Sequence, residues 1–156
     1  MEAIKTVKLS KTYGKLTAVD GLDLAIAQGE LFALLGVNGA GKTTTLKMLA
    51  CLTRPSGGDA LLNGHSVISE PAAVKRIIGV SPQETAVAPN LTALENLLLM
   101  GGVHGLSGQA AQRRADELTQ RFGLSPILSR RAGKLSGGWQ RRLSIAMALV
   151  SAPEIL

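Results

Sequence analysis

Residues 36–43 (GVNGAGKT) carry the most specific chemistry in this sequence. They satisfy the spacing G-x-x-x-x-G-K-[ST], in which glycines allow the backbone to wrap a phosphate chain with its amides pointing inward. Lys42 can reach the β- and γ-phosphates, and the Thr43 hydroxyl can coordinate Mg²⁺. A chance glycine turn before a helix is the alternative. The spacing therefore predicts a nucleoside triphosphate site, but it does not distinguish a kinase from a GTPase or a transport ATPase.

A second anion site is indicated at Leu135-Ser-Gly-Gly-Trp139, immediately before a helical pattern. The hydroxyl of Ser136, the amides of Gly137 and Gly138, and the N-terminus of the helix all favour a negative charge. Taken alone, Ser-Gly-Gly is an ordinary linker. One nucleotide can use both glycine motifs only if the fold brings the two together.

Strands and helices must position these motifs. The apolar run 31–35 (LFALL) is continuous, which is typical of a strand buried on both faces and directly precedes the phosphate loop. Turn residues and alternation predict strands at Ile4–Ser10, Asp23–Ala27, Glu30–Leu35, Asp59–Leu62 and Ile77–Val80. Gln28-Gly29 is expected to join the second and third of these, and Asn63-Gly64 is expected to close a tight turn.

Helical periodicity follows the phosphate loop, where Leu46, Leu49 and Ala50 share a face. A short helix is predicted to open at Pro71, and Thr92 with Glu95 forms a capping box. Further apolar stripes predict two more helices, one through Ala111, Ala115, Leu118 and Phe122 and one through Leu143, Ala146, Met147 and Val150. The pattern predicts an α/β core with a helical insertion over roughly residues 84–135.

Composition narrows the class of protein. The chain has 156 residues, 46% of them hydrophobic, one cysteine and a formal net charge of +6. A single cysteine excludes an internal disulfide. The basic residues are dispersed and the recognised nucleic-acid signatures are absent, so a solvated basic surface is the simpler interpretation. No apolar stretch is long enough to span a membrane, so any membrane role requires a partner.

Together, GVNGAGKTTT, Gln83 and LSGG before a helix resemble the nucleotide-binding domain of ABC transporters, in order and over the whole chain. The run KTTTLKMLACLTRPSGG is most similar to exporter-type members, including drug and polysaccharide exporters. The resemblance implies a P-loop NTPase fold of the ABC ATPase type, with an antiparallel β subdomain. It also implies one incomplete ATP-binding domain over 1–156, with core parts at 1–83 and 136–156 and a helical subdomain at 84–135.

The resemblance also implies a role for each motif. Tyr13 would stack on adenine, and Gln83 and Lys42 would be catalytic. Thr43 and Gln83 would hold Mg²⁺. In a head-to-tail dimer, Ser136, Gly137 and Gly138 would bind the γ-phosphate of ATP held by the partner domain. The residues implied to bind that ATP through the phosphate loop are Gly36, Asn38, Gly39, Ala40, Gly41, Lys42, Thr43 and Thr44.

By the same resemblance, the protein would be an ATPase subunit that drives export, with ATP and Mg²⁺ as its cofactors. Its partners would be a transmembrane subunit and a second nucleotide-binding domain, without nucleic acid. It would lie in the cytoplasm on the inner face of the membrane, attached through the partner subunit. The alternatives are an ABC-type ATPase acting on DNA or ribosomes, a small-molecule kinase with the same phosphate loop, and an inactive remnant.

The sequence departs from the family pattern in two places. Trp139 occupies the fifth signature position, where glutamine or another polar or flexible residue is usual. The chain also stops at Leu156, before the acidic strand on which P-loop hydrolases rely to complete the magnesium shell. We therefore expect a C-terminally truncated domain that binds ATP weakly and has little or no turnover alone.

Overall fold

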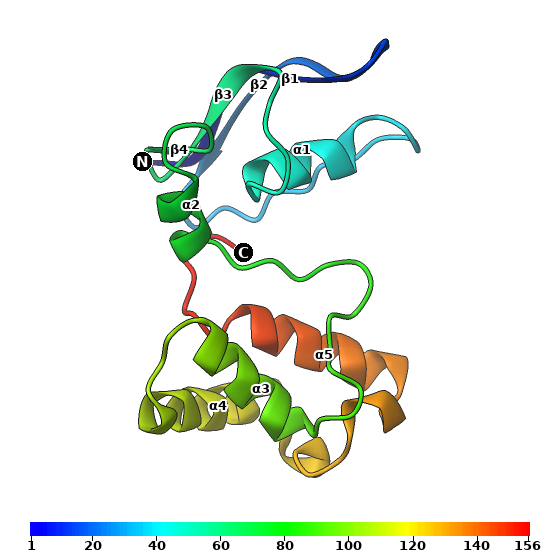
Figure 1. The fold of residues 1–156 in the computed structure, drawn as a ribbon, viewed down its shortest axis with the longest axis vertical. Coiled ribbons are helices and arrows are strands. Elements are labelled where there is room, and N and C mark those ends of the chain that lie inside the picture. The colour runs from blue at the N-terminus through cyan, green and yellow to red at the C-terminus, as the bar shows by residue number, and fades with distance from the viewer. The chain divides into compact units, whose positions relative to one another are not determined.

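The computed structural model describes residues 1–156, which separate into two compact units, 1–78 and 79–156 (Figure 1). The first unit contains a four-stranded sheet and two helices, and the second contains three longer helices. The phosphate loop belongs to the first unit, whereas Gln83 and the signature motif belong to the second. The division of one domain into core parts and an 84–135 helical subdomain stays a prediction.

The sheet of the first unit is antiparallel throughout. Its strands are β1 (Glu2–Tyr13), β2 (Leu16–Ala27), β3 (Gly57–Leu62) and β4 (His65–Ser66), in the order β2-β1-β3-β4. The connection between β3 and β4 is the predicted Asn63-Gly64 turn, and both residues have positive φ, 45° and 85°. Two positive φ angles suit the right-handed twist of a hairpin.

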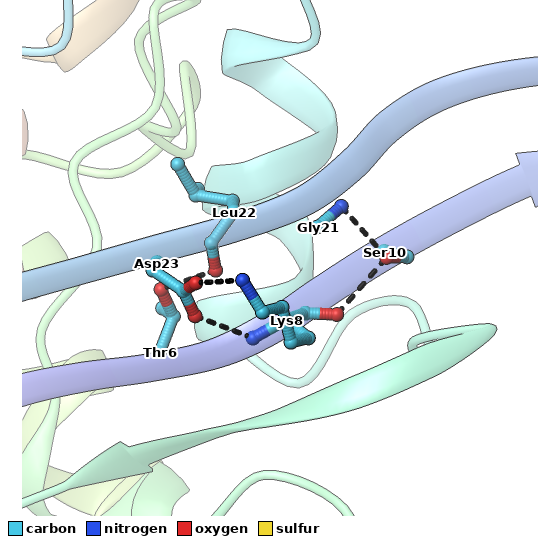
Figure 2. A network of polar contacts seen from close by, with 6 residues as sticks. All are labelled: Thr6, Lys8, Ser10, Gly21, Leu22 and Asp23. Atoms are coloured by element: carbon cyan, nitrogen blue, oxygen red, sulfur yellow. Dashed lines mark hydrogen bonds and ion pairs between the residues drawn. The ribbon is translucent and has the colours of Figure 1, made fainter.

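A bulge in β1 is held by polar side chains of β1 itself and of β2 (Figure 2). Lys8 adopts a positive φ of 48°. The Asp23 carboxylate accepts hydrogen bonds from the Lys8 backbone amide at 2.7 Å and from the Lys8 ammonium at 2.6 Å. On the other side, the Ser10 hydroxyl donates to the Lys8 carbonyl and accepts from the Gly21 amide, both at 2.9 Å. These bonds satisfy the backbone groups that the irregular register leaves without a ladder partner.

The expected strand at Glu30–Leu35 is wrong for this structure. No strand is assigned there, and Leu31 and Leu35 are 100% and 87% exposed. A strand requires a neighbour for its backbone groups. Within residues 1–156, both sides of β1 are already paired, with β2 and β3, and no other strand runs beside 30–35. The predicted β2 was also too short, because it begins at Leu16 rather than Asp23.

The helices of the first unit are α1 (Lys42–Leu49) and α2 (Pro71–Ile77). The predicted apolar face of α1 is partly wrong, since Leu46 is 59% exposed and the buried positions are Thr45, Met48 and Leu49. The expected strand at Ile77–Val80 is also wrong as an element. Ile77 still belongs to α2, and only Ile78 has bridge geometry.

The second unit consists of α3 (Ala93–Val103), α4 (Gly108–Phe122) and α5 (Gly137–Ala148), with single 3₁₀ turns at Ser125–Ile127 and Ala132–Lys134. The capping box at the start of α3 is confirmed. The predicted stripes of α4 and α5 meet in one apolar core, whose fully buried members include Leu97, Leu118, Leu124, Ile127 and Leu143. No helix of the chain has the length and apolar character to cross a bilayer.

Candidate functional site

Residues 36–41 form a curled loop that ends at the first residue of α1, as the phosphate-loop motif predicts. Gly39 and Gly41 have positive φ angles of 88° and 80°. The Ala40 amide donates to the Val37 carbonyl at 3.2 Å. The Lys42 ammonium folds back over the loop, donating to the carbonyls of Gly36 at 2.5 Å and Val37 at 2.8 Å. The loop is therefore wound around the head group of its own lysine.

The start of α1 presents backbone donors that the chain does not use. The first amide of the region with an intrahelical acceptor is that of Thr45, which donates to Gly41 at 2.8 Å. The amides of Gly41, Lys42, Thr43 and Thr44 donate no hydrogen bond within the chain. Helix α1 also has no side-chain cap and no acidic residue in its first turn. Free amides at a positive helix end suit a phosphate group.

Gly41 is the position in this loop where a side chain cannot fit. Its φ is positive, and a Cβ atom there would collide with the carbonyl oxygen of Ala18 in β2 and lie 3.0 Å from the Val19 side chain. Only glycine allows this approach. The loop therefore packs directly on β2, which fixes its position on the sheet.

Tyr13 and Ala18 both lie near the turn that joins β1 to β2. Tyr13 is the last residue of β1 and pairs with Leu16 in the ladder. Ala18, whose carbonyl oxygen Gly41 approaches, follows Leu16 by two residues. Tyr13 is 47% exposed, and the Lys11 ammonium lies 5.0 Å from the centroid of its ring. The structure thus places an accessible aromatic side chain at the end of the hairpin on whose second strand the phosphate loop packs.

Ser136 is the N-cap residue of α5, with φ −62° and ψ 157°. Unlike Thr92 and Ser107, whose side chains accept a backbone amide of α3 or α4, the Ser136 hydroxyl makes no capping bond. An added Cβ atom on Gly137 or Gly138 would meet nothing within 4 Å. The signature motif therefore presents an uncommitted hydroxyl and free amides to open space.

Gln83 is exposed in a bend, and its side chain makes no hydrogen bond. The chain on both sides of it is attached to α5. The Arg141 guanidinium donates to the Pro82 carbonyl, and the Thr85 hydroxyl donates to the Gln140 side-chain oxygen at 3.3 Å. The structure thus brings the Gln83 segment and the signature helix together within the second unit.

Some contributors to these sites were not predicted. Ala18 limits residue 41 to glycine, and no feature of the sequence indicates this. Gln140 joins several segments around the signature motif, and its place directly after LSGGW is the only signal in the sequence. Trp139, which departs from the family pattern, is half-buried against the helical core with the Arg142 guanidinium carbon 4.7 Å from its ring centroid.

The chain is similar to known proteins in sequence and in fold. The family model described as ABC transporter matches residues 19–156. The daunorubicin/doxorubicin resistance ATP-binding protein DrrA of Streptomyces peucetius is 47% identical over 99% of this chain and 47% of its own length. The Nod factor export ATP-binding protein I of Paraburkholderia xenovorans is 40% identical over 99% of this chain and 51% of its own.

The fold is also similar to that of a solved structure. The dimeric post-hydrolysis state of an ATP-binding cassette bound to ADP and Pi superposes with a TM-score of 0.83 at 31% identity, covering 96% of this chain and 70% of that one. The chain spans about half the length of the curated relatives that it matches.

Proposed function

Because the chain belongs to the ABC transporter family of ATP-binding proteins, we propose that it supplies the ATP-binding part of an exporter. The observation that carries the proposal is the curled loop 36–43, in which the Lys42 ammonium and the free amides of Gly41 to Thr44 converge at the start of α1. A cation and a set of backbone donors at one helix end form a polyphosphate cradle.

Lys42 would exchange partners when ATP binds. Its ammonium now donates to two neutral carbonyls, those of Gly36 and Val37. Phosphate oxygens carry full negative charge and form stronger, charge-assisted bonds with an ammonium. The same positive-φ glycines then keep the loop wound around the phosphates, and the Tyr13 ring is available to stack on adenine.

Magnesium fits the first turn of α1. The Thr43 side chain is exposed at the second position of the helix and makes no hydrogen bond, so its hydroxyl can join a shell formed mainly by phosphate oxygens and water. We propose Thr43 as the residue of this unit that holds the ion; the expected role of Gln83 in holding it stays a prediction. When bound, Mg²⁺ would neutralise charge on the phosphates.

The signature motif would serve a nucleotide held by a second nucleotide-binding domain. The free hydroxyl of Ser136 and the open backbone at Gly137 and Gly138 support this role. The solved relative described above is dimeric and holds ADP and Pi. We propose a head-to-tail dimer that closes on ATP and reopens after hydrolysis.

Transport would require a membrane partner. The relatives carry the words resistance and export in their names, and no helix of this chain can cross a bilayer. We propose that a transmembrane subunit converts closure of the dimer into export, with this chain in the cytoplasm on the inner face of the membrane. Little or no turnover by residues 1–156 alone stays a prediction, which an ATP hydrolysis assay tests.

Substitution of Lys42 tests the proposal. Lys42→Ala removes the cation from the loop, and we expect MgATP affinity to fall about tenfold or more, since a hydrogen bond to a charged group contributes roughly 1.5–3 kcal/mol. Titration calorimetry measures the affinity. Lys47→Ala, on an exposed position of the same helix, is the matched control and should bind like the parent. Equal MgATP affinity of Lys42→Ala and the parent would show that the phosphate loop does not bind the nucleotide through Lys42.

A further inference from the structure

We propose that Gln140 is a positioning residue, which holds the segment carrying Gln83 and the turn before Ser136 in one shared arrangement. The inference rests on the proposed function, because it concerns how two parts of that site are placed. It assigns a task to a side chain to which neither the motif pattern nor the resemblance gives one.

The side-chain amide of Gln140 uses both of its ends. Its nitrogen donates to the carbonyl of Ala132 at 3.1 Å and to that of Leu135 at 3.2 Å. These two carbonyls bound the turn that leads into Ser136. Its oxygen accepts from the Thr85 hydroxyl at 3.3 Å. One amide thus connects the signature turn with a residue two positions after Gln83, and all three bonds lie within the second unit.

Two further contacts attach the same segment to the same helix. The Arg141 guanidinium donates to the Pro82 carbonyl, and the hydroxyls of Ser81 and Ser144 lie 3.5 Å apart. Positions 140, 141 and 144 follow helical spacing, so they form one side of α5. Residues 81–85 therefore lie along the first turns of the signature helix.

Gln83 itself contributes nothing to this attachment. Its side chain is exposed and has no hydrogen-bond partner, so its position is set by its neighbours on both sides. Pro82 and Thr85 are both bound to α5. Any displacement of the signature helix would be passed to Gln83 through these bonds, and the bonds of Gln140 would pass it to the turn before Ser136 as well.

Cleavage by a glutamate-specific protease tests this link locally. Glu84 is exposed between Gln83 and Thr85, and Glu117 is exposed within α4 of the same unit. The ratio of cleavage after Glu84 to cleavage after Glu117 within the same molecules reports loosening of residues 81–85, because a loss of stability of the whole unit raises both. For Gln140→Met we expect this ratio to rise about fivefold, as loss of the single hydrogen bond that joins Gln140 to residues 81–85 implies.

Matched variants distinguish local loosening of residues 81–85 from a general loss of stability. Thr85→Val should raise the ratio similarly, and Thr85→Ser, which keeps the hydroxyl, should restore it. The double variant of Thr85→Val with Gln140→Met should be no looser than either alone, since both remove the same bond. Gln120→Met makes the same chemical change at an exposed position of α4 and should leave the ratio unchanged. An unchanged ratio in Gln140→Met or Thr85→Val would overturn the inference.

A kinetic measurement on the full ATPase assembly provides the functional result. Gln140→Met should lower kcat about tenfold and leave KM for ATP within about twofold, because misplacing Gln83 affects the reaction more than nucleotide binding. An unchanged kcat would also overturn the positioning role. Failure of the parent to bind MgATP would refute the proposed function without altering the protease result, so the two failures are distinguishable.

Discussion

At the scale of single residues, Lys42 and Gly41 show how the phosphate loop is kept ready. The Lys42 ammonium has two carbonyl partners in its own loop, so the charge is already directed inward before any ligand binds. Gly41 is fixed by its approach to Ala18. A loop that is already wound pays less conformational entropy when it binds its ligand.

Tyr13 provides a prediction at this scale. Tyr13→Ala should weaken ATP binding about fivefold or more, since a base stacked on an aromatic ring contributes roughly 1–3 kcal/mol. Tyr13→Phe keeps the ring and should bind like the parent. Fluorescence titration with a labelled ATP analogue measures both affinities. If Tyr13→Ala binds as tightly as Tyr13→Phe, the ring has no role in nucleotide binding.

At the scale of elements, three helices of the second unit begin with a hydroxyl residue, and these residues have different tasks. Thr92 accepts the Glu95 amide at 3.2 Å, and Ser107 accepts the Ala110 amide at 3.4 Å. Ser136 caps nothing. A residue type that normally stabilises a helix start is therefore uncommitted only at the signature motif, where a ligand is proposed.

This difference predicts that replacement by alanine lowers the stability of the fold at Thr92 but not at Ser136. Thr92→Ala should cost about 1 kcal/mol in the free energy of unfolding, as loss of an N-cap does. Ser136→Ala should leave that free energy within about 0.5 kcal/mol of the parent. It should also spare ATP binding by the monomer but impair ATP-dependent pairing of domains, which analytical ultracentrifugation detects. A large loss of stability in Ser136→Ala would assign the hydroxyl to folding.

The β1 bulge is the second element with a measurable consequence. Hydrogen bonds from the Lys8 side chain and amide lower the pKa of Asp23 below its usual value. A carboxylate with a depressed folded-state pKa stabilises the fold above its unfolded pKa, and this stability is lost as the pH falls through the folded pKa.

We therefore expect Asp23→Asn to be less stable than the parent at neutral pH, with the difference shrinking below about pH 4. Denaturant unfolding at a series of pH values measures it. Asp20→Asn, at an exposed position of the same strand, should follow the parent at every pH. A constant difference between Asp23→Asn and the parent down to pH 2 would contradict the role of the ionised carboxylate.

At the scale of the whole molecule, the chain consists of two units, and the second has a core of its own. Every residue of the helical core cluster lies within 79–156. The Arg114 guanidinium also closes the far end of α5, donating to the Leu149 carbonyl at 2.7 Å and the Val150 carbonyl at 3.3 Å. A cation at a helix C-terminus is favourable, so this unit contains both its own apolar core and the group that closes the C-terminal end of α5.

A polypeptide of residues 79–156 should therefore fold alone. We expect a helical circular dichroism spectrum and a cooperative thermal transition. Leu118→Ala, which empties a fully buried position, should destabilise that transition by about 2–5 kcal/mol. A featureless, non-cooperative melt of the isolated polypeptide would show that the helical unit depends on the first unit.

Features that depend on neighbours in the sequence could be predicted, whereas features that depend on distant parts of the chain could not. Capping residues, the Asn63-Gly64 turn and the helical stripes of α4 and α5 were predictable because each depends on contacts between near neighbours in the chain. The segment Glu30–Leu35 was not, because a strand exists only where another strand accepts its hydrogen bonds. Leu46 was misplaced because the core-facing side of α1 depends on what packs against it.

By itself the sequence determined the two glycine motifs, the family to which they belong and the residues available to bind phosphate. Those features depend on residue type and short spacing. Only the tertiary structure decided that Gly41 must be glycine because of Ala18, that the Ser136 hydroxyl is uncommitted, and that Gln140 ties the Gln83 segment to the signature turn. These facts depend on atoms distant in the chain, whose approach is set by packing rather than by local preference.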